Sequence, residues 1–149
     1  MRQTLIAIGI WMAASVATIC PAQAEDTRHI YDWKVTRIID GDTVEIEAPY
    51  LPKPLKPVLS IRVYGVDTPE KGWRGKCDAE KELGAAATKF TTNLIDEAKT
   101  IQVELMQWDK FGGRVLGDII IDGASLTALL IANGYAREYH GEAKKSWCE

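Results

Sequence analysis

Five stretches of the chain alternate between apolar and polar residues with a period of two, and they are rich in Val and Ile. This pattern predicts β-strands, because successive side chains of a strand point to opposite faces. The stretches cover residues 30–39, 42–47, 58–66, 101–105 and 115–121. The dipeptide Asp40-Gly41 between the first two predicts a hairpin turn. Four prolines within residues 49–57 exclude continuous strand pairing there and predict a loop.

Two other stretches repeat apolar residues at the spacing of a helix. The longer one predicts a helix that begins at Asp78, with Asp78 as the N-cap, and runs to about Ala98. The shorter one predicts a helix that is capped by Ser125 and closed by Asn133-Gly134. Five strands with one helix after the third and another after the fifth predict an α+β, mainly β fold, a small barrel with helical additions.

The first 24 residues have the pattern of a secretory signal peptide. A basic residue opens the chain, residues 5–19 are mostly apolar, and residues 22–24 form an A-x-A site. A membrane anchor is the alternative, but a spanning helix needs about 20 apolar residues and this stretch is shorter. We therefore expect cleavage after Ala24, a single domain over residues 25–149, no membrane association after cleavage, and a periplasmic or secreted protein.

Charge and composition narrow the function classes. The chain of 149 residues carries a formal net charge of −3, which excludes a globally basic nucleic-acid binder but allows a local basic pocket or a bound cation. A hydrophobic content of 46% excludes a mostly disordered protein.

Cleavage of the leader would leave two cysteines, Cys77 and Cys148. An even pair in an exported chain favours a disulfide, and closing a loop of this length contributes about 4 kcal/mol in the chain-entropy model. The alternative is a metal site with His29 and His140, although no CxxC or HxxxH spacing supports zinc.

Three polar clusters carry candidate chemistry, at residues 40–43, 62–70 and 109–114. Each by itself is also consistent with an ordinary polar turn. Together they offer carboxylates at strand ends, which hold hard cations through oxygen, and two arginines, which can grip one phosphate. A further carboxylate can take a proton from water. This set is typical of metal-assisted phosphodiester hydrolysis.

The chain resembles the thermonuclease family, that of staphylococcal nuclease. The resemblance runs from about Val35 to Tyr139 and is carried by IIDGDTVEI, then IRVYGVDTPE, then a helix, then DKFGGR. It implies a five-stranded OB-fold barrel with two or so added helices. The third motif has an extra glycine, Gly112-Gly113, relative to the family pattern, and glycine accepts the dihedral angles of a widened turn that still presents Arg114.

For the metal and the attacking water, the resemblance implies four residues. Asp42 and Asp67 would bind Ca²⁺, and the backbone carbonyl of Thr68 would be a further ligand. Glu70 would be the general base. Thr43 and Asp40 would support this group from nearby.

For the substrate, the resemblance implies five residues. Arg62 and Arg114 would bind the scissile phosphate. Lys110, Phe111 and Tyr139 would contact the nucleotide, with Tyr139 stacking on a base. Packing of the C-terminal tail is an equal alternative for Tyr139.

The function that follows is a secreted or periplasmic, Ca²⁺-dependent nuclease that cleaves DNA and RNA without sequence preference. We expect a monomer with nucleic acid as substrate and no stable protein partner. One alternative is a noncatalytic OB-fold module that binds single strands or another protein. Another is a calcium-stabilised structural domain, which would explain the aspartates but not the arginines or Glu70.

Overall fold

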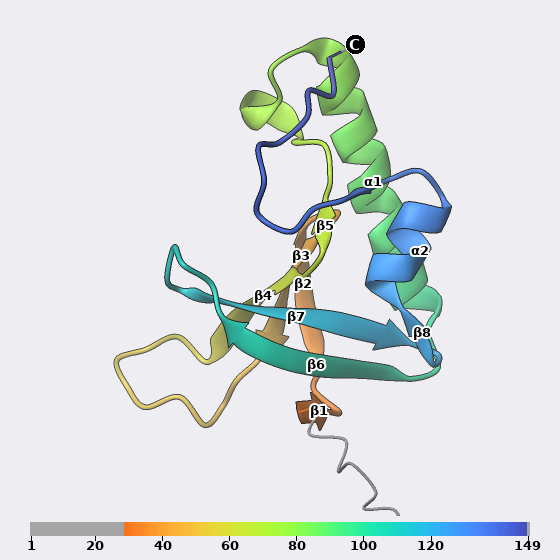
Figure 1. Ribbon diagram of the computed structural model, residues 1–149. Coiled ribbons are helices and arrows are strands. Elements are labelled where there is room, and N and C mark those ends of the chain that lie inside the picture. The colour runs from red at the N-terminus through yellow and green to blue at the C-terminus, as the bar shows by residue number, and fades with distance from the viewer. Residues whose placement is uncertain (1–28, 149) are drawn as a thin grey trace, which may run out of the picture.

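A computed structural model describes residues 29–148 of the chain (Figure 1). The signal peptide expected at residues 1–24 lies outside the described residues. Within the described part, the chain forms strands, two α-helices and one 3-10 helix. Their bounds are β1 His29–Tyr31, β2 Val35–Asp40, β3 Thr43–Glu47, β4 Val58–Val63, β5 Val66–Asp67, η1 Gly72–Arg74, α1 Asp78–Glu97, β6 Ile101–Trp108, β7 Arg114–Ile121, β8 Ala124–Ser125, α2 Leu126–Ala132 and β9 Arg137–Glu138. No described helix is long and apolar enough to cross a membrane.

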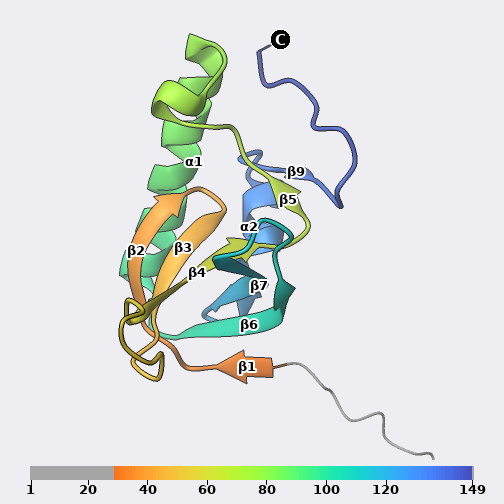
Figure 2. The same ribbon diagram turned by 90° about the vertical axis from the view of Figure 1, so that its left-hand side faces the viewer.

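One large sheet contains most of the strands. Its hydrogen-bonded order is β1-β6-β7-β4-β3-β2, and β8 adds to β7. All pairings are antiparallel except β4 with β7, which is parallel. Figure 2 shows β1 beside β6 at the edge of this sheet. A second, two-stranded sheet pairs β5 with β9.

The predicted α+β, mainly β class is confirmed as a strand-rich sheet with two helices. The five-stranded closed barrel is not confirmed, because the strands at the two ends of the large sheet, β1 and β2, are not paired with each other in the described part. Helix α1 packs against β2, α2 packs against β7, and the two helices touch each other.

Two of the predicted strands are divided in the structure. The stretch 30–39 forms β1 and β2, because the chain leaves its partner β6 and then pairs with β3. The stretch 58–66 forms β4 and β5, because the chain turns at Gly65, which has a φ of 80° that favours glycine. This turn sends Asp67 and the residues after it away from the large sheet.

The hydrophobic core lies between the large sheet and the helices. Its fully buried side chains come mainly from β3, β4, β7 and α2, and each contributes about 1.5–3 kcal/mol by leaving water. They include Val44, Ile46, Ile61, Val63, Val103, Ile119, Leu126 and Leu130.

The longer helix begins and ends where the pattern predicts, but its cap is different. The N-cap is Cys77, whose sulfur accepts a hydrogen bond from the backbone N–H of Glu80. Asp78 is the first helical residue, so the prediction that Asp78 is the N-cap was wrong. The short helix has the predicted cap, since Ser125 accepts from Ala128 N.

The buried face of α1 matches its apolar stripe only in part. Leu83 is 43% exposed, whereas Gly84 and Thr91 are buried. Thr91 Oγ1 donates to the carbonyl of Gly41 at 2.8 Å, so the helix lies directly on the β2–β3 turn. A Cβ at Gly84 would lie 2.7 Å from the carbonyl oxygen of Glu70. The helix therefore uses small side chains to approach the backbone of the candidate site.

The predicted disulfide between Cys77 and Cys148 is present in the structure. It ties the C-terminal segment to the start of α1, and Figure 1 shows this segment returning to that end of the helix. The alternative of a metal site that uses these cysteines with His29 and His140 was wrong.

Candidate active site

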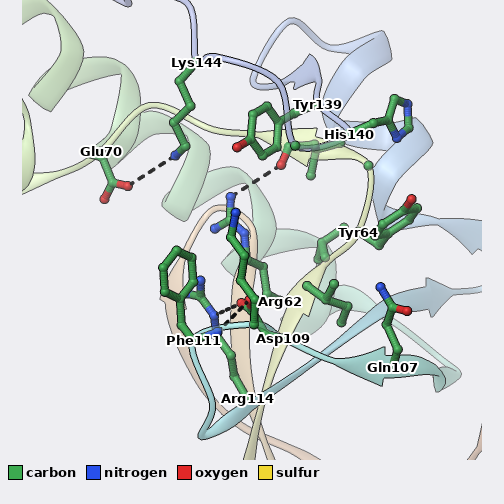
Figure 3. Close-up of a pocket in the computed structure, with 16 residues that line it drawn as sticks. Arg62, Tyr64, Glu70, Gln107, Asp109, Phe111, Arg114, Tyr139, His140 and Lys144 are labelled. Carbon is green, nitrogen blue, oxygen red and sulfur yellow. Dashed lines mark hydrogen bonds and ion pairs between the residues drawn. The ribbon is translucent and has the colours of Figure 1, made fainter.

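The two candidate phosphate-binding arginines lie on neighbouring strands. Arg62 is on β4, and Arg114 opens β7, its parallel partner. In the register, Ser60 pairs with Arg114 and Arg62 pairs with Leu116. Because the two arginines are offset by two residues, they project from the same face of the sheet. Both line a pocket of about 510 Å³ (Figure 3).

The extra glycine does not remove Arg114 from this site. Gly112 and Gly113 have φ angles of 67° and 70°, which they adopt without a clash. The turn is closed by hydrogen bonds from Asp109 N to Arg114 O, 3.1 Å, and from Gly112 N to Asp109 O, 3.0 Å. The two glycines therefore complete a turn that returns the chain to β7 in register.

Asp109 holds the side chain of Arg114. Its carboxylate pairs with Arg114 Nε and also accepts a hydrogen bond from Phe111 N at 3.3 Å. Burial by itself would raise the pKa of Asp109, but these hydrogen bonds and the charges of Arg114 and Arg62 lower the pKa below its ordinary value. Asp109 is therefore an anion that orients Arg114, a candidate phosphate-binding residue.

Arg62 is held in a similar way by the candidate metal ligand Asp42. Arg62 NH1 donates to Asp42 Oδ1 at 2.9 Å, and NH2 donates to the carbonyl of Val66 at 3.4 Å. The Arg62 side chain is 15% exposed. Each of the two arginines thus has a carboxylate partner that fixes its direction.

Asp42 and Asp67 are buried carboxylates in the two segments that Arg62 contacts. They are 2% and 5% exposed. Asp42 also accepts hydrogen bonds from Thr43 Oγ1 at 2.9 Å and from Thr68 N at 3.3 Å. The link through Thr68, the residue after Asp67, brings the predicted metal-binding residues together.

The donors of this pair fit a hard divalent cation. Oδ1 of Asp67 is buried, and among residues 29–148 it has a cationic neighbour, the ammonium of Lys144, but no aligned hydrogen-bond donor. Carboxylate and carbonyl oxygens are the ligands that Ca²⁺ and Mg²⁺ prefer, and such sites often keep positions for water and substrate phosphate. Three His, Cys, Asp or Glu side chains meet within ligand distance only at Cys77, Glu80 and Cys148 among residues 29–148, and those sulfur atoms form the disulfide.

Glu70, the candidate base, lies at the rim of the same pocket. Its backbone N–H donates to Glu80 Oε1 at 3.4 Å. Its carboxylate lies between two cations, with Arg74 Nε 3.5 Å from Oε2 and Lys144 Nζ 3.9 Å from Oε1. Glu80 therefore fixes the backbone of Glu70, and the two cations face its carboxylate.

Asp40 stabilises the same edge of the site. It accepts from Arg74 NH2 at 2.6 Å, and Lys71 Nζ lies 3.9 Å from its other oxygen. Because Arg74 also contacts Glu70, Asp40 acts on the candidate base through this arginine. The supporting role of Asp40 stays a prediction, and this contact is the route by which it would act.

The three candidate nucleotide contacts all line the pocket. Phe111 is 74% exposed, and Lys110 lies beside it with Nζ 5.2 Å from the ring centroid. Tyr139 approaches from the other side, where its N–H donates to Gly65 O at 2.9 Å. Figure 3 shows Tyr139 and Phe111 on opposite sides of Arg62. Tyr64, Gln107 and His140 also line the pocket and were not predicted.

Four further residues of the site were missed. They come from the helix, the 3-10 turn and the tail, and apart from the contact of Arg74 with Glu70 four residues earlier, their contacts with the candidate site residues join segments ten or more residues apart. They are Arg74, Glu80, Lys144 and Trp147. In contrast, Asp109 stood inside a recognised motif, and its spacing from Arg114 across a turn was a usable signal.

Comparison with known proteins gave two findings. The sequence model of the family described as staphylococcal nuclease homologue matches residues 60–147, a range that includes Arg62, Asp67, Glu70 and Arg114. The chain is also 31% identical over 114 residues to Endonuclease YhcR of Bacillus subtilis (strain 168). That match covers 73% of this chain but 9% of the relative, so the chain corresponds to a small part of that protein.

Proposed function

This chain belongs to the family of staphylococcal nuclease homologues, and from this membership and the site geometry we propose that it is a nuclease. It hydrolyses phosphodiester bonds of DNA and RNA without sequence preference and requires a divalent cation, which we assign as Ca²⁺. The observation that carries the proposal is the pocket in which Arg62, Arg114 and Glu70 meet. Two guanidinium groups and one carboxylate are what a phosphate and an attacking water require.

The metal would be held by Asp42, Asp67 and the Thr68 carbonyl, and when bound it supplies positive charge that stabilises the phosphate oxygens in the transition state. The arginines bind the scissile phosphate and stabilise the negative charge that develops on it. Glu70 accepts a proton from the water that attacks phosphorus, and as the new P–O bond forms, the P–O bond to the leaving sugar oxygen breaks and that oxygen takes a proton from solvent.

The residues that hold the catalytic groups explain why the site is preorganised. Asp42 and Asp109 orient the two arginines before substrate arrives, so less side-chain entropy is lost on binding. Phe111, at the open rim, offers a surface for base stacking, which tolerates every base and suits cleavage without sequence preference.

We assign endonuclease action to this site. A second hollow, of about 220 Å³, shares Arg62, Glu70 and Arg114 with the larger pocket and extends toward Arg74 and the glycine turn. The catalytic groups therefore have open space on two sides, which supports passage of a strand that continues in both directions from the cleaved bond.

We place the mature protein outside the cytoplasm, in the periplasm or the medium, as a monomer without a stable protein partner. The N-terminal pattern of the sequence and the Cys77–Cys148 disulfide support this location, because disulfides persist in oxidising compartments.

The test is cleavage of single-stranded DNA, duplex DNA and RNA by the purified protein with Ca²⁺, with Mg²⁺ and with a chelator. We expect cleavage with Ca²⁺, none with the chelator, and a fall of about a hundredfold or more in Glu70→Gln, the scale expected on removal of a general base. Asp96→Asn on the surface of α1 is the matched control and should retain the wild-type rate.

Binding of nucleic acid without metal and without turnover would refute the nuclease proposal and favour a noncatalytic binding module. Wild-type turnover in Glu70→Gln would refute the role of Glu70 alone. Circular dichroism of both variants separates loss of chemistry from loss of folding.

A further inference from the structure

The C-terminal segment crosses the candidate metal site. We call residues 141–148 the strap. It follows β9, which is paired with β5, the strand that contains Asp67. It ends at Cys148, which is bonded to Cys77 at the start of α1. The strap is thus fixed at both ends, with Asp67 and Glu70 beneath it.

Lys144 of the strap lies against both acidic residues. Its Nζ is 2.5 Å from Asp67 Oδ1 and 3.9 Å from Glu70 Oε1. Figure 3 shows the Lys144 side chain directed at Glu70 across the rim of the pocket. Asp67 Oδ1 has no aligned hydrogen bond from any donor in residues 29–148. The ammonium of Lys144 therefore provides the charge that faces this oxygen.

Trp147 holds the strap over the other oxygen of the same carboxylate. Its Nε1–H donates to Asp67 Oδ2 at 3.1 Å. Arg137 of β9 lies over the indole ring, 3.8 Å from its centroid, and its NH1 donates to Ser146 O at 2.7 Å. These contacts position the strap in register with Asp67.

We propose that Lys144 is a built-in competitor of the divalent cation and sets the metal affinity of the site. The ammonium neutralises Asp67 when metal is absent, and it must leave Asp67 Oδ1 before a cation can bind that oxygen. The disulfide keeps Lys144 at high effective concentration next to the carboxylate. The proposal rests on the metal site of the proposed function.

The direct test is isothermal titration of Ca²⁺ into the wild-type protein and Lys144→Met at fixed ionic strength, without nucleic acid. We expect the variant to bind Ca²⁺ about fivefold more tightly, the scale of a half-exposed ion pair that no longer has to be broken. Lys144→Arg keeps the charge and should remain within about twofold of the wild type.

Lys145→Met is the matched control. Lys145 is the next residue, is exposed, and forms no ion pair within residues 29–148. The substitution removes the same charge from the same segment but breaks no ion pair with Asp67. The Ca²⁺ affinity of Lys145→Met should therefore stay near that of the wild type. An equal gain in both variants would overturn the proposal in favour of a general charge effect. No gain, or a loss, in Lys144→Met would overturn it as well.

The disulfide provides an independent test. Cys77→Ser with Cys148→Ser frees the strap, and serine at position 77 preserves an N-cap for α1. We expect tighter Ca²⁺ binding in this double variant, and a smaller further gain when Lys144→Met is added, because both changes act on one contact. Full additivity of the two gains would overturn the role of the disulfide.

Nuclease assays on the same samples distinguish the two proposals. A shift in Ca²⁺ affinity without cleavage by any sample would refute the proposed function and leave the competition by Lys144 in place. Cleavage by the wild type with equal Ca²⁺ affinity in Lys144→Met would refute the competition alone. Absence of Ca²⁺ binding in every variant, the freed strap included, would refute the competition and the metal site together.

Discussion

The contact between Gly84 and the backbone of Glu70 predicts that one methyl group on α1 disturbs the candidate catalytic carboxylate. In Gly84→Ala the new Cβ would lie 2.6 Å from Glu70 C and 2.7 Å from the carbonyl oxygens of Glu70 and Pro69. Ordinary contacts between heavy atoms begin at 3.4 Å. The helix and the Glu70 segment must therefore separate by about 0.8 Å.

Two effects on stability oppose each other. Overpacking of a buried contact costs about 1–3 kcal/mol, whereas Gly to Ala inside a helix contributes about 1 kcal/mol. We expect a net loss of about 0–2 kcal/mol, measured by urea unfolding. A displacement near 1 Å of a reacting group costs about a hundredfold in rate, so we expect activity to fall far more than stability.

The assay is the rate of DNA cleavage with Ca²⁺, compared with the unfolding free energy of the same sample. Ala85→Gly, at an exposed position next to Gly84, measures the helix-propensity contribution separately and should leave the rate unchanged. If Gly84→Ala cleaved at the wild-type rate, the inference that α1 positions Glu70 through this backbone contact would be refuted.

Three further predictions concern single features. Arg62→Lys should lower cleavage by tenfold or more at unchanged stability, because an ammonium cannot replace the paired donors of a guanidinium, and steady-state kinetics measures this. Burial raises the pKa of Asp118, and an acid with a raised folded pKa makes the fold less stable as pH rises from about 4 through that pKa. Asp118→Asn should remove this fall, as followed by urea midpoints between about pH 4 and pH 7. Cys77→Ser with Cys148→Ser should lower the unfolding free energy by about 4 kcal/mol, measured by urea unfolding, because it frees a loop that spans a sequence separation of 71 residues.

The elements that sequence reasoning located well are those defined by local periodicity. The helix from Asp78, the hairpin at Asp40-Gly41 and the strand that ends at Ile121 depend on neighbours within a few residues. The division of residues 30–39 was not predictable in this way, because the two halves differ in partner strand and not in residue type. The choice of a distant partner strand does not change the hydrophobic periodicity of either strand.

The residues of the candidate site also fall into two groups, those found from a local pattern and those that only the fold brings together. The motif residues Arg62, Asp67 and Glu70 were identified from one continuous segment. The apolar stripe of α1 correctly placed Ala87, Phe90, Leu94 and Ile95 toward the core, but it wrongly included Leu83. It also missed Gly84 and Thr91, which are buried by close approach to backbone and not by apolar size. Lys144 is far from Asp67 and Glu70 in sequence, and only the fold and the disulfide bring it into contact with them.

The parallel pairing of β4 with β7 has a consequence for synthesis of the protein. Loop closure between such distant strands comes late, since the entropy of closing the chain is lost before the contact repays it. A nascent polypeptide that ends before β7 has the carboxylates but only one of the two arginines of the phosphate site. Under the proposed function, the two-arginine site is therefore complete only after β7 has been made, and an unfinished chain that ends before Arg114 lacks half of its phosphate-binding charge.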